Sequence, residues 1–122
     1  MDTANFLWAC KQIYFLNIHP FDTDKVEDEN YEKVVQIGQI ALNELGTQNF
    51  LGYLLEGQYR VELWAAMIFL ETKNIEEKKA LINSPNQTAK YHCIQSIEKY
   101  ITSPHISERR KQSGSKFLAK LV

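Results

Sequence analysis

The chain contains few residues that interrupt helices and few that cross-link loops. Its 122 residues include five Gly, three Pro and two Cys. Scarce Gly and Pro argue against disorder and against turn-rich β architectures, and two cysteines cannot supply a disulfide framework. A chain of this length can nevertheless bury an ordinary hydrophobic core without cross-links. We therefore expect a single helical domain over residues 1–122, all-α and compact.

The sequence also lacks the segments that direct a protein into or across a membrane. No stretch approaches the roughly 18 uninterrupted apolar residues of a membrane span. The N-terminal segment carries Asp2 where a signal peptide has positive charge. Cys10 and Cys93 fall on predicted apolar helix faces, which favours free, buried thiols in a reducing compartment. These absences predict a cytoplasmic protein with no membrane association.

Catalytic and ligand-binding signatures are missing as well. The three histidines have no partners in a recognised zinc spacing, and no glycine-rich phosphate loop is present. We therefore expect no catalytic residue, no metal and no cofactor. One enzymatic alternative stays open, in which Cys93 is a nucleophile activated by His19 or His105, because catalytic partners meet in space rather than in sequence.

Hydrophobic spacing divides the chain into six or seven helices. Residues 4–18 are apolar nearly all round, so this helix is expected to be central or packed on two sides. The next helix is expected over 24–45, with Asp24 as its N-cap, Glu27 in a capping-box position and Gly46 as its stop. Further helices are expected close to residues 47–57, 58–74, 75–82, 86–103 and 105–122.

Three of these helices carry further signals. The apolar spacing of 58–74 predicts a deeply buried helix. Asn86 and Ser107 are expected to cap the last two helices, and the Ser113-Gly114-Ser115 segment is expected to kink or fray the final one.

One pair of these predicted helices resembles a known type of repeat. The run YRVELWAAMIFL at 59–70, followed by NIEEKKAL at 74–81, is similar to the helix pair of small bacterial HEAT-like proteins. That resemblance implies a stack of HEAT-like hairpins. Proteins of this size and type include immunity proteins of bacterial toxin systems, among them contact-dependent growth inhibition. The resemblance therefore implies a small cytosolic protein that binds and blocks a toxin's catalytic domain.

Charge is distributed unevenly although the net charge is only -1. Residues 1–60 contain nine Asp or Glu against four Lys or Arg, and six of the acids lie between Asp22 and Glu32. Capping explains Asp24 and Glu27, whereas the remaining acids repel one another unless a cationic partner approaches. Such a partner would be a basic toxin domain such as a nuclease. The predicted partner-binding residues are Asp22, Asp24, Asp28, Glu29, Tyr31, Glu32, Tyr53 and Tyr59.

The second half of the chain has the opposite balance, with six acidic against ten basic residues. Arg109, Arg110 and Lys111 lie together in the last predicted helix, and clustered cations can neutralise phosphates. A nucleic-acid-binding module is therefore an alternative hypothesis. A solvated terminal helix explains the same residues, and a pI near 6.3 favours that explanation.

Overall fold

The computed structural model describes residues 4–22, 27–72, 80–81 and 84–120. In chain order these residues form α1 (Ala4–Phe15), α2 (Glu29–Leu45), α3 (Thr47–Phe50), the 3-10 helix η2 (Leu51–Leu55), α4 (Val61–Thr72), a small β1 (Ala80–Leu81) and β2 (Ser84–Thr88) hairpin, α5 (Ala89–Ile101) and α6 (Glu108–Ala119). The prediction of a compact all-α fold is confirmed.

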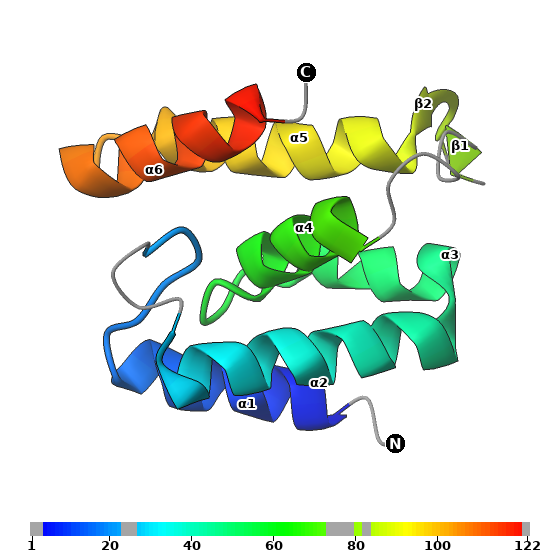
Figure 1. The fold of residues 1–122 in the computed structure, drawn as a ribbon. Helices are drawn as coiled ribbons and strands as arrows, with labels where there is room; N and C mark the ends of the chain where they lie inside the picture. Colours follow the sequence, from blue (N-terminus) through cyan, green and yellow to red (C-terminus); the bar gives the residue numbers. More distant parts are fainter. Residues whose placement is uncertain (1–3, 23–26, 73–79, 82–83, 121–122) are drawn as a thin grey trace.

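The helices are arranged in three layers (Figure 1). α1 packs against α2 on one side, α5 packs against α6 on the other, and α4 lies between the two pairs in contact with α2 and α5. Residues 63–70 of α4 are all buried, as the sequence predicts for this segment. The apolar helix α4 therefore has neighbours on several sides, η2 among them.

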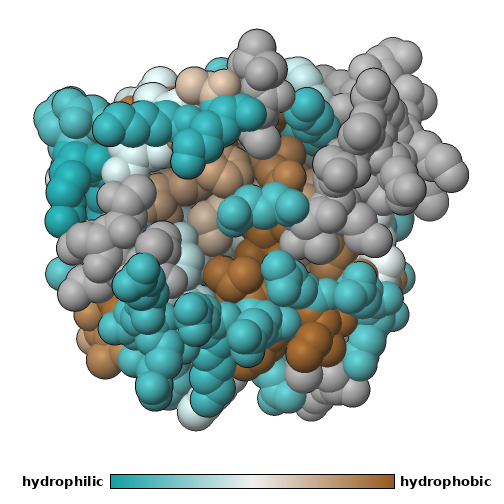
Figure 2. All heavy atoms as spheres, viewed as in Figure 1, coloured by the Kyte–Doolittle hydropathy of each residue, from teal (hydrophilic) through white to brown (hydrophobic). Residues whose placement is uncertain are grey.

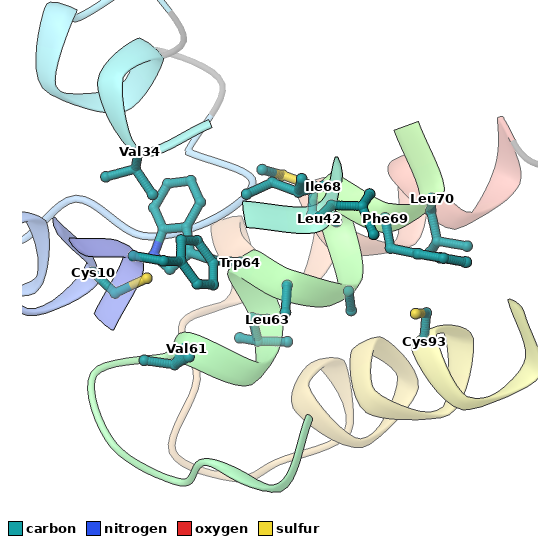
Figure 3. Packing of buried hydrophobic residues seen from close by; sticks show 14 of the residues in the cluster. Cys10, Val34, Leu42, Val61, Leu63, Trp64, Ile68, Phe69, Leu70 and Cys93 are labelled. Atoms are coloured by element: carbon teal, nitrogen blue, oxygen red, sulfur yellow. The ribbon is translucent and has the colours of Figure 1, made fainter. Parts of the chain in front are cut away.

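Close approach of helices in this core depends on small residues. A Cβ at Gly38 would collide with Ile68 and come within 2.9 Å of a ring carbon of Phe6. Figure 3 shows Trp64 of α4 reaching between Cys10 of α1 and Val34 of α2. Glycine at position 38 therefore lets α2 meet α1 and α4 at once.

Several predicted boundaries are wrong at the ends of helices. α2 begins at Glu29 rather than at 24, because Asp28 has an extended backbone and its side chain accepts a hydrogen bond from the Asn30 N–H at 2.8 Å. Asp24 lies outside the described residues. α1 ends at Phe15 instead of continuing to residue 18. Gly46, at φ 80°, does end α2, as predicted.

The region between α4 and α5 differs from the prediction. A helix was expected over 75–82, but Ala80–Leu81 forms β1 and pairs antiparallel with β2; residues 73–79 and 82–83 lie outside the described residues. Asn86 falls in β2, so it does not cap α5, which begins at Ala89. At Ala80–Leu81, local hairpin pairing thus takes the place of the expected helix.

The last helix shows the predicted cap. Ser107 accepts a hydrogen bond from the Arg110 N–H at 3.4 Å, which satisfies one of the free donors of the first turn. The helix continues through Gly114, where fraying was expected, because Gly114 is buried and a Cβ there would lie 2.6 Å from Ile101. Close packing on α5 stabilises the residues around this glycine.

Candidate functional site

The acidic segment from Asp22 to Glu32 does not form one continuous surface. Asp22 is only 4% exposed, and its carboxylate forms a two-point ion pair with Arg110: Nε lies 3.0 Å from Oδ1 and the second guanidinium nitrogen 3.2 Å from Oδ2. The His19 N–H donates to the same carboxylate at 3.0 Å. The prediction that Asp22 binds a cationic partner protein is therefore wrong, because Arg110 of this chain's own α6 already neutralises its carboxylate.

The first turn of α2 retains the acidic residues that face solvent. Glu29 and Glu32 are exposed, and Asp28 is half-buried as the N-cap. Acidic side chains in this position also favour the positive end of the helix dipole. Asp28, Glu29 and Glu32 are what remains of the predicted acidic surface within the described residues, and we call them the acidic turn.

Tyr31 was also predicted to bind a partner, and the structure places it in the core. Its hydroxyl donates to the sulfur of Met67 at 3.4 Å, and its ring meets Trp64 edge-on at a centroid distance of 4.9 Å. Burial raises the pKa of Tyr31 to about 12. Residue 31 falls on the apolar stripe of α2, which packs on α4, so the assignment to the interface is wrong.

Tyr53 and Tyr59 are half-buried. Tyr53 packs edge-on against Phe6 and Phe50, at centroid distances of 5.0 and 5.5 Å. Tyr59 has a different setting, because it lies against exposed residues of α1: Tyr14 at 5.6 Å and Phe15 at 5.9 Å. Of these two predicted contacts, Tyr59 adjoins an exposed apolar surface and Tyr53 adjoins the core.

Five of the eight exposed large apolar side chains among the described residues lie in α1 or directly after it, where the sequence prediction placed a central helix. Trp8 is 59% exposed, Phe15 68% and Leu16 54%. Trp8 and Phe15 are seven residues apart, so they lie on the same side of the helix. Leu7 and Tyr14 are exposed on its flank. We call Leu7, Trp8, Tyr14, Phe15 and Leu16 the α1 outer face.

The sequence of α1 is apolar nearly all round, and this pattern predicted a helix that is central or packed on two sides. The prediction is wrong, because the α1 outer face is exposed. Only one side of α1, with Phe6, Cys10 and Ile13, meets the core. In the view of Figure 2, hydrophilic side chains gather over α2 and hydrophobic atoms are visible at the level of α4. A helix that is apolar on its solvent side has no folding reason to be so.

Two shallow hollows border the α1 outer face. One, of about 270 Å³, lies between Trp8, Lys11 and Tyr59, and Lys11 Nζ stands 5.8 Å from the centre of the Tyr59 ring. The other, of about 170 Å³, is shared by Leu16, directly after α1, with Asn30 and Lys33 of α2. The Leu16 end of the α1 outer face therefore borders the start of α2, the helix that also contains the acidic turn, and Lys11 and Lys33 line the two hollows.

The basic residues of α6 are partly committed to the fold. Arg110 holds Asp22 and also donates to the Asn17 carbonyl at 3.4 Å. Lys111 lies 3.9 Å from Glu108 in the same helix. Arg109 is exposed. Of the three cations in the nucleic-acid hypothesis, Arg110 is thus neutralised by Asp22 inside the protein. The positive charge available to a phosphate is reduced accordingly.

Both thiols lie in surroundings unlike those of a nucleophile. Cys10 and Cys93 are fully buried, and burial raises the pKa of each thiol above its usual range. A reactive cysteine needs the opposite shift. Among the described residues, no group of three His, Cys, Asp or Glu side chains is placed to hold a metal ion.

None of the helices in the described part of the chain combines the length and the hydrophobicity that a membrane crossing requires. Compared with protein-family models, with curated proteins and with solved structures, the chain shows no significant match.

Proposed function

We propose that this chain is a non-enzymatic protein-binding module that neutralises a cationic bacterial toxin domain, as an immunity protein does. The observation that carries the proposal is the exposure of Trp8 and Phe15 on the α1 outer face. Large aromatic side chains dominate the binding energy of protein interfaces when they enter a pocket of the partner. Exposed apolar patches on stable proteins commonly mark such sites.

The acidic turn supports a cationic partner. It lies at the start of α2, the helix that packs against α1, and a charged rim beside an apolar interface accelerates encounter and determines orientation more than it adds affinity. A nuclease domain is basic because its substrate is a polyanion, so carboxylates at the rim would face the groove meant for phosphates. In this arrangement the aromatic face provides affinity and the acidic turn provides steering.

The test uses the protein encoded beside this chain, since an immunity gene is expected next to its toxin gene. Growth of cells that express the neighbouring product is measured with and without this chain, and binding of the two purified proteins is measured by calorimetry. We expect rescue of growth together with tight binding. Failure of the two proteins to bind, with growth not rescued, would contradict the proposal.

Two sets of variants separate the roles of the two surfaces. Phe15→Ala should weaken binding by about tenfold or more. Reversing the charge of Asp28, Glu29 and Glu32 should slow association and reduce its salt dependence. Glu98→Lys, at an exposed position of α5, is the matched control. Unchanged affinity and salt dependence after charge reversal would remove the acidic turn from the interface.

A further inference from the structure

The connection between α1 and α2 contains a buried histidine with charged groups close to its ring. His19 is only 7% exposed, and its Nδ1 has no hydrogen-bond partner among the described residues. The charges that act on it come from Asp22 in the same connection, from Arg60 directly before α4 and from Arg110 in α6. From α1, the ring of Tyr14 packs on it at a centroid distance of 5.6 Å. The histidine therefore lies in a closed site with two cations and one acid.

The single acid of this site is already committed to other donors. Asp22 Oδ1 accepts from Arg110, and Oδ2 accepts from Arg110 and from the backbone N–H of His19. A proton on the buried ring would place a third positive charge beside Arg60 and Arg110. Burial, followed by Arg110, lowers the pKa of His19 from 6.5 to about 4, although Asp22 acts in the opposite direction. The closed connection therefore binds this proton poorly.

Two strained residues flank the histidine. Asn17 and Phe21 have φ angles of 59° and 72°, a left-handed conformation that is unfavourable for residues other than glycine. Contacts with α6 hold both residues in place. Arg110 donates to the Asn17 carbonyl at 3.4 Å. The Phe21 ring packs on Phe117 at a centroid distance of 5.1 Å. The connection is therefore a strained turn that its contacts with α6 keep closed, and opening it relaxes the backbone.

The histidine ring also supports one end of the α1 outer face. Tyr14, which packs on His19, also lies against Phe15 at a centroid distance of 5.7 Å. A further contact joins Tyr14 to Tyr59 at 5.6 Å. These rings form a continuous series of contacts from the connection to the exposed aromatic residues of α1. Movement of the His19 ring into water would therefore remove a support of Tyr14 and alter the α1 outer face.

We propose that the α1–α2 connection is an acid-operated conformational switch, in which protonation of His19 opens residues 17–22 and rearranges the Tyr14 end of the α1 outer face. In the open form the ring lies in water and has its ordinary pKa near 6.5. The open form therefore binds the proton more tightly than the closed form, so acid favours opening. Between pH 7.5 and pH 5 this difference increases the open-to-closed ratio by about 30-fold. The switch is a property of the free chain and does not rest on the proposed function.

Hydrogen exchange of the intact free chain measures the opening. The backbone N–H groups of His19 and Asp22 are both bonded within the connection, to the Asp22 carboxylate and to the His19 carbonyl. Their protection factors, corrected for the intrinsic pH dependence of exchange, are compared at pH 7.5 and pH 5 with those of buried α4 amides such as Ile68. We expect lower protection in the connection than in α4 at both pH values, and a fall of about 30-fold in the connection at pH 5. Equal protection in the two segments would overturn the proposal, because the connection would then open only when the whole chain unfolds.

A second measurement on the same chain follows the ring itself. In NMR spectra recorded across this pH range, the ring C–H signals of His19 should titrate with a pKa below 6.5, because the closed form resists the proton. This measurement needs no substitution, so it does not depend on whether a variant folds. A ring that titrates near 6.5 while the connection stays protected would overturn the proposal.

Variants assign the proton to this histidine. His19→Gln removes the titrating ring, so the fall in protection at pH 5 should disappear. His105→Gln, at an exposed position before α6, is the matched control and should keep the fall. Arg60→Met removes one of the two cations beside the ring, so the pKa of His19 should rise and the fall in protection should become smaller. A fall that persists in full in His19→Gln would assign the opening to other groups and contradict the proposal.

Discussion

α4 and α1 are both strongly apolar twelve-residue helices, and their surroundings are opposite. In α4, residues 63–70 are all buried, with α2 on one side and α5 on the other. In α1, Trp8 and Phe15 face outward. Folding alone accounts for the apolar residues of α4, whereas Trp8 and Phe15 of α1 are more than half exposed and lie outside the buried core. The comparison separates residues that build the fold from residues available to a partner.

The sharpest test of this comparison uses the two tryptophans. Trp64→Ala should lower the free energy of unfolding by about 3–5 kcal/mol, because it opens a cavity between α1, α2 and α4. Trp8→Ala should cost less than about 1 kcal/mol, as expected of a largely exposed site. Urea unfolding measures both. Equal losses would show that Trp8 is packed in solution and would break the contrast.

The second prediction concerns the ion pair between the α1–α2 connection and α6. Arg110→Met should destabilise the protein by about 3 kcal/mol, because the Asp22 carboxylate stays buried without its cation. Arg109→Met, next to it and exposed, is the matched control. Adding Asp22→Asn to Arg110→Met should recover part of the loss in a double-mutant cycle. A loss as small as that of Arg109→Met would show that the pair contributes no more than a surface contact.

The third prediction concerns the close approach of α2 to α1 and α4. Gly38→Ala should cost about 1–3 kcal/mol, because the new methyl group meets Ile68 and Phe6. Gly52→Ala is the control, since nothing lies within 4 Å of a Cβ there; it should be neutral or slightly stabilising. Thermal unfolding distinguishes them. A neutral Gly38→Ala would mean that the three helices can move apart at little cost.

The last prediction concerns a dependence on pH. Burial, together with the nearby Arg110, lowers the pKa of His19 from 6.5 to about 4. The unfolded chain therefore binds this proton more readily, so stability is full above pH 6.5 and falls as the pH decreases toward 4, by at most about 1.4 kcal/mol per pH unit. His19→Gln should flatten the stability profile in that window. An unchanged profile would contradict the burial of His19 as a neutral ring.

Much of the fold follows from local sequence signals. The depth of α4 follows from its continuous apolar residues, the end of α2 from Gly46, and the start of α6 from Ser107. These features depend on short-range spacing and capping chemistry, which a sequence contains in full. The acid that caps α2 could not be chosen by the same reasoning, because both Asp24 and Asp28 fit the preference for that position.

The candidate site was harder to predict, because it depends on contacts between distant segments. Nothing near Asp22 in the sequence indicates that Arg110 neutralises it, and Tyr31 looks like any aromatic beside acids until α4 packs on it. The periodicity of α1 indicates an apolar helix but does not say how many sides are covered. That number depends on the positions of the other helices.

The Asp22–Arg110 pair also bears on how long the native state survives. Its two partners are 88 residues apart in the sequence, so closing this contact early would demand the ordering of a long loop. We therefore expect the pair to form after the folding transition state. Its loss should then speed unfolding and leave the folding rate nearly unchanged. This one contact would therefore contribute to the kinetic stability of the folded chain.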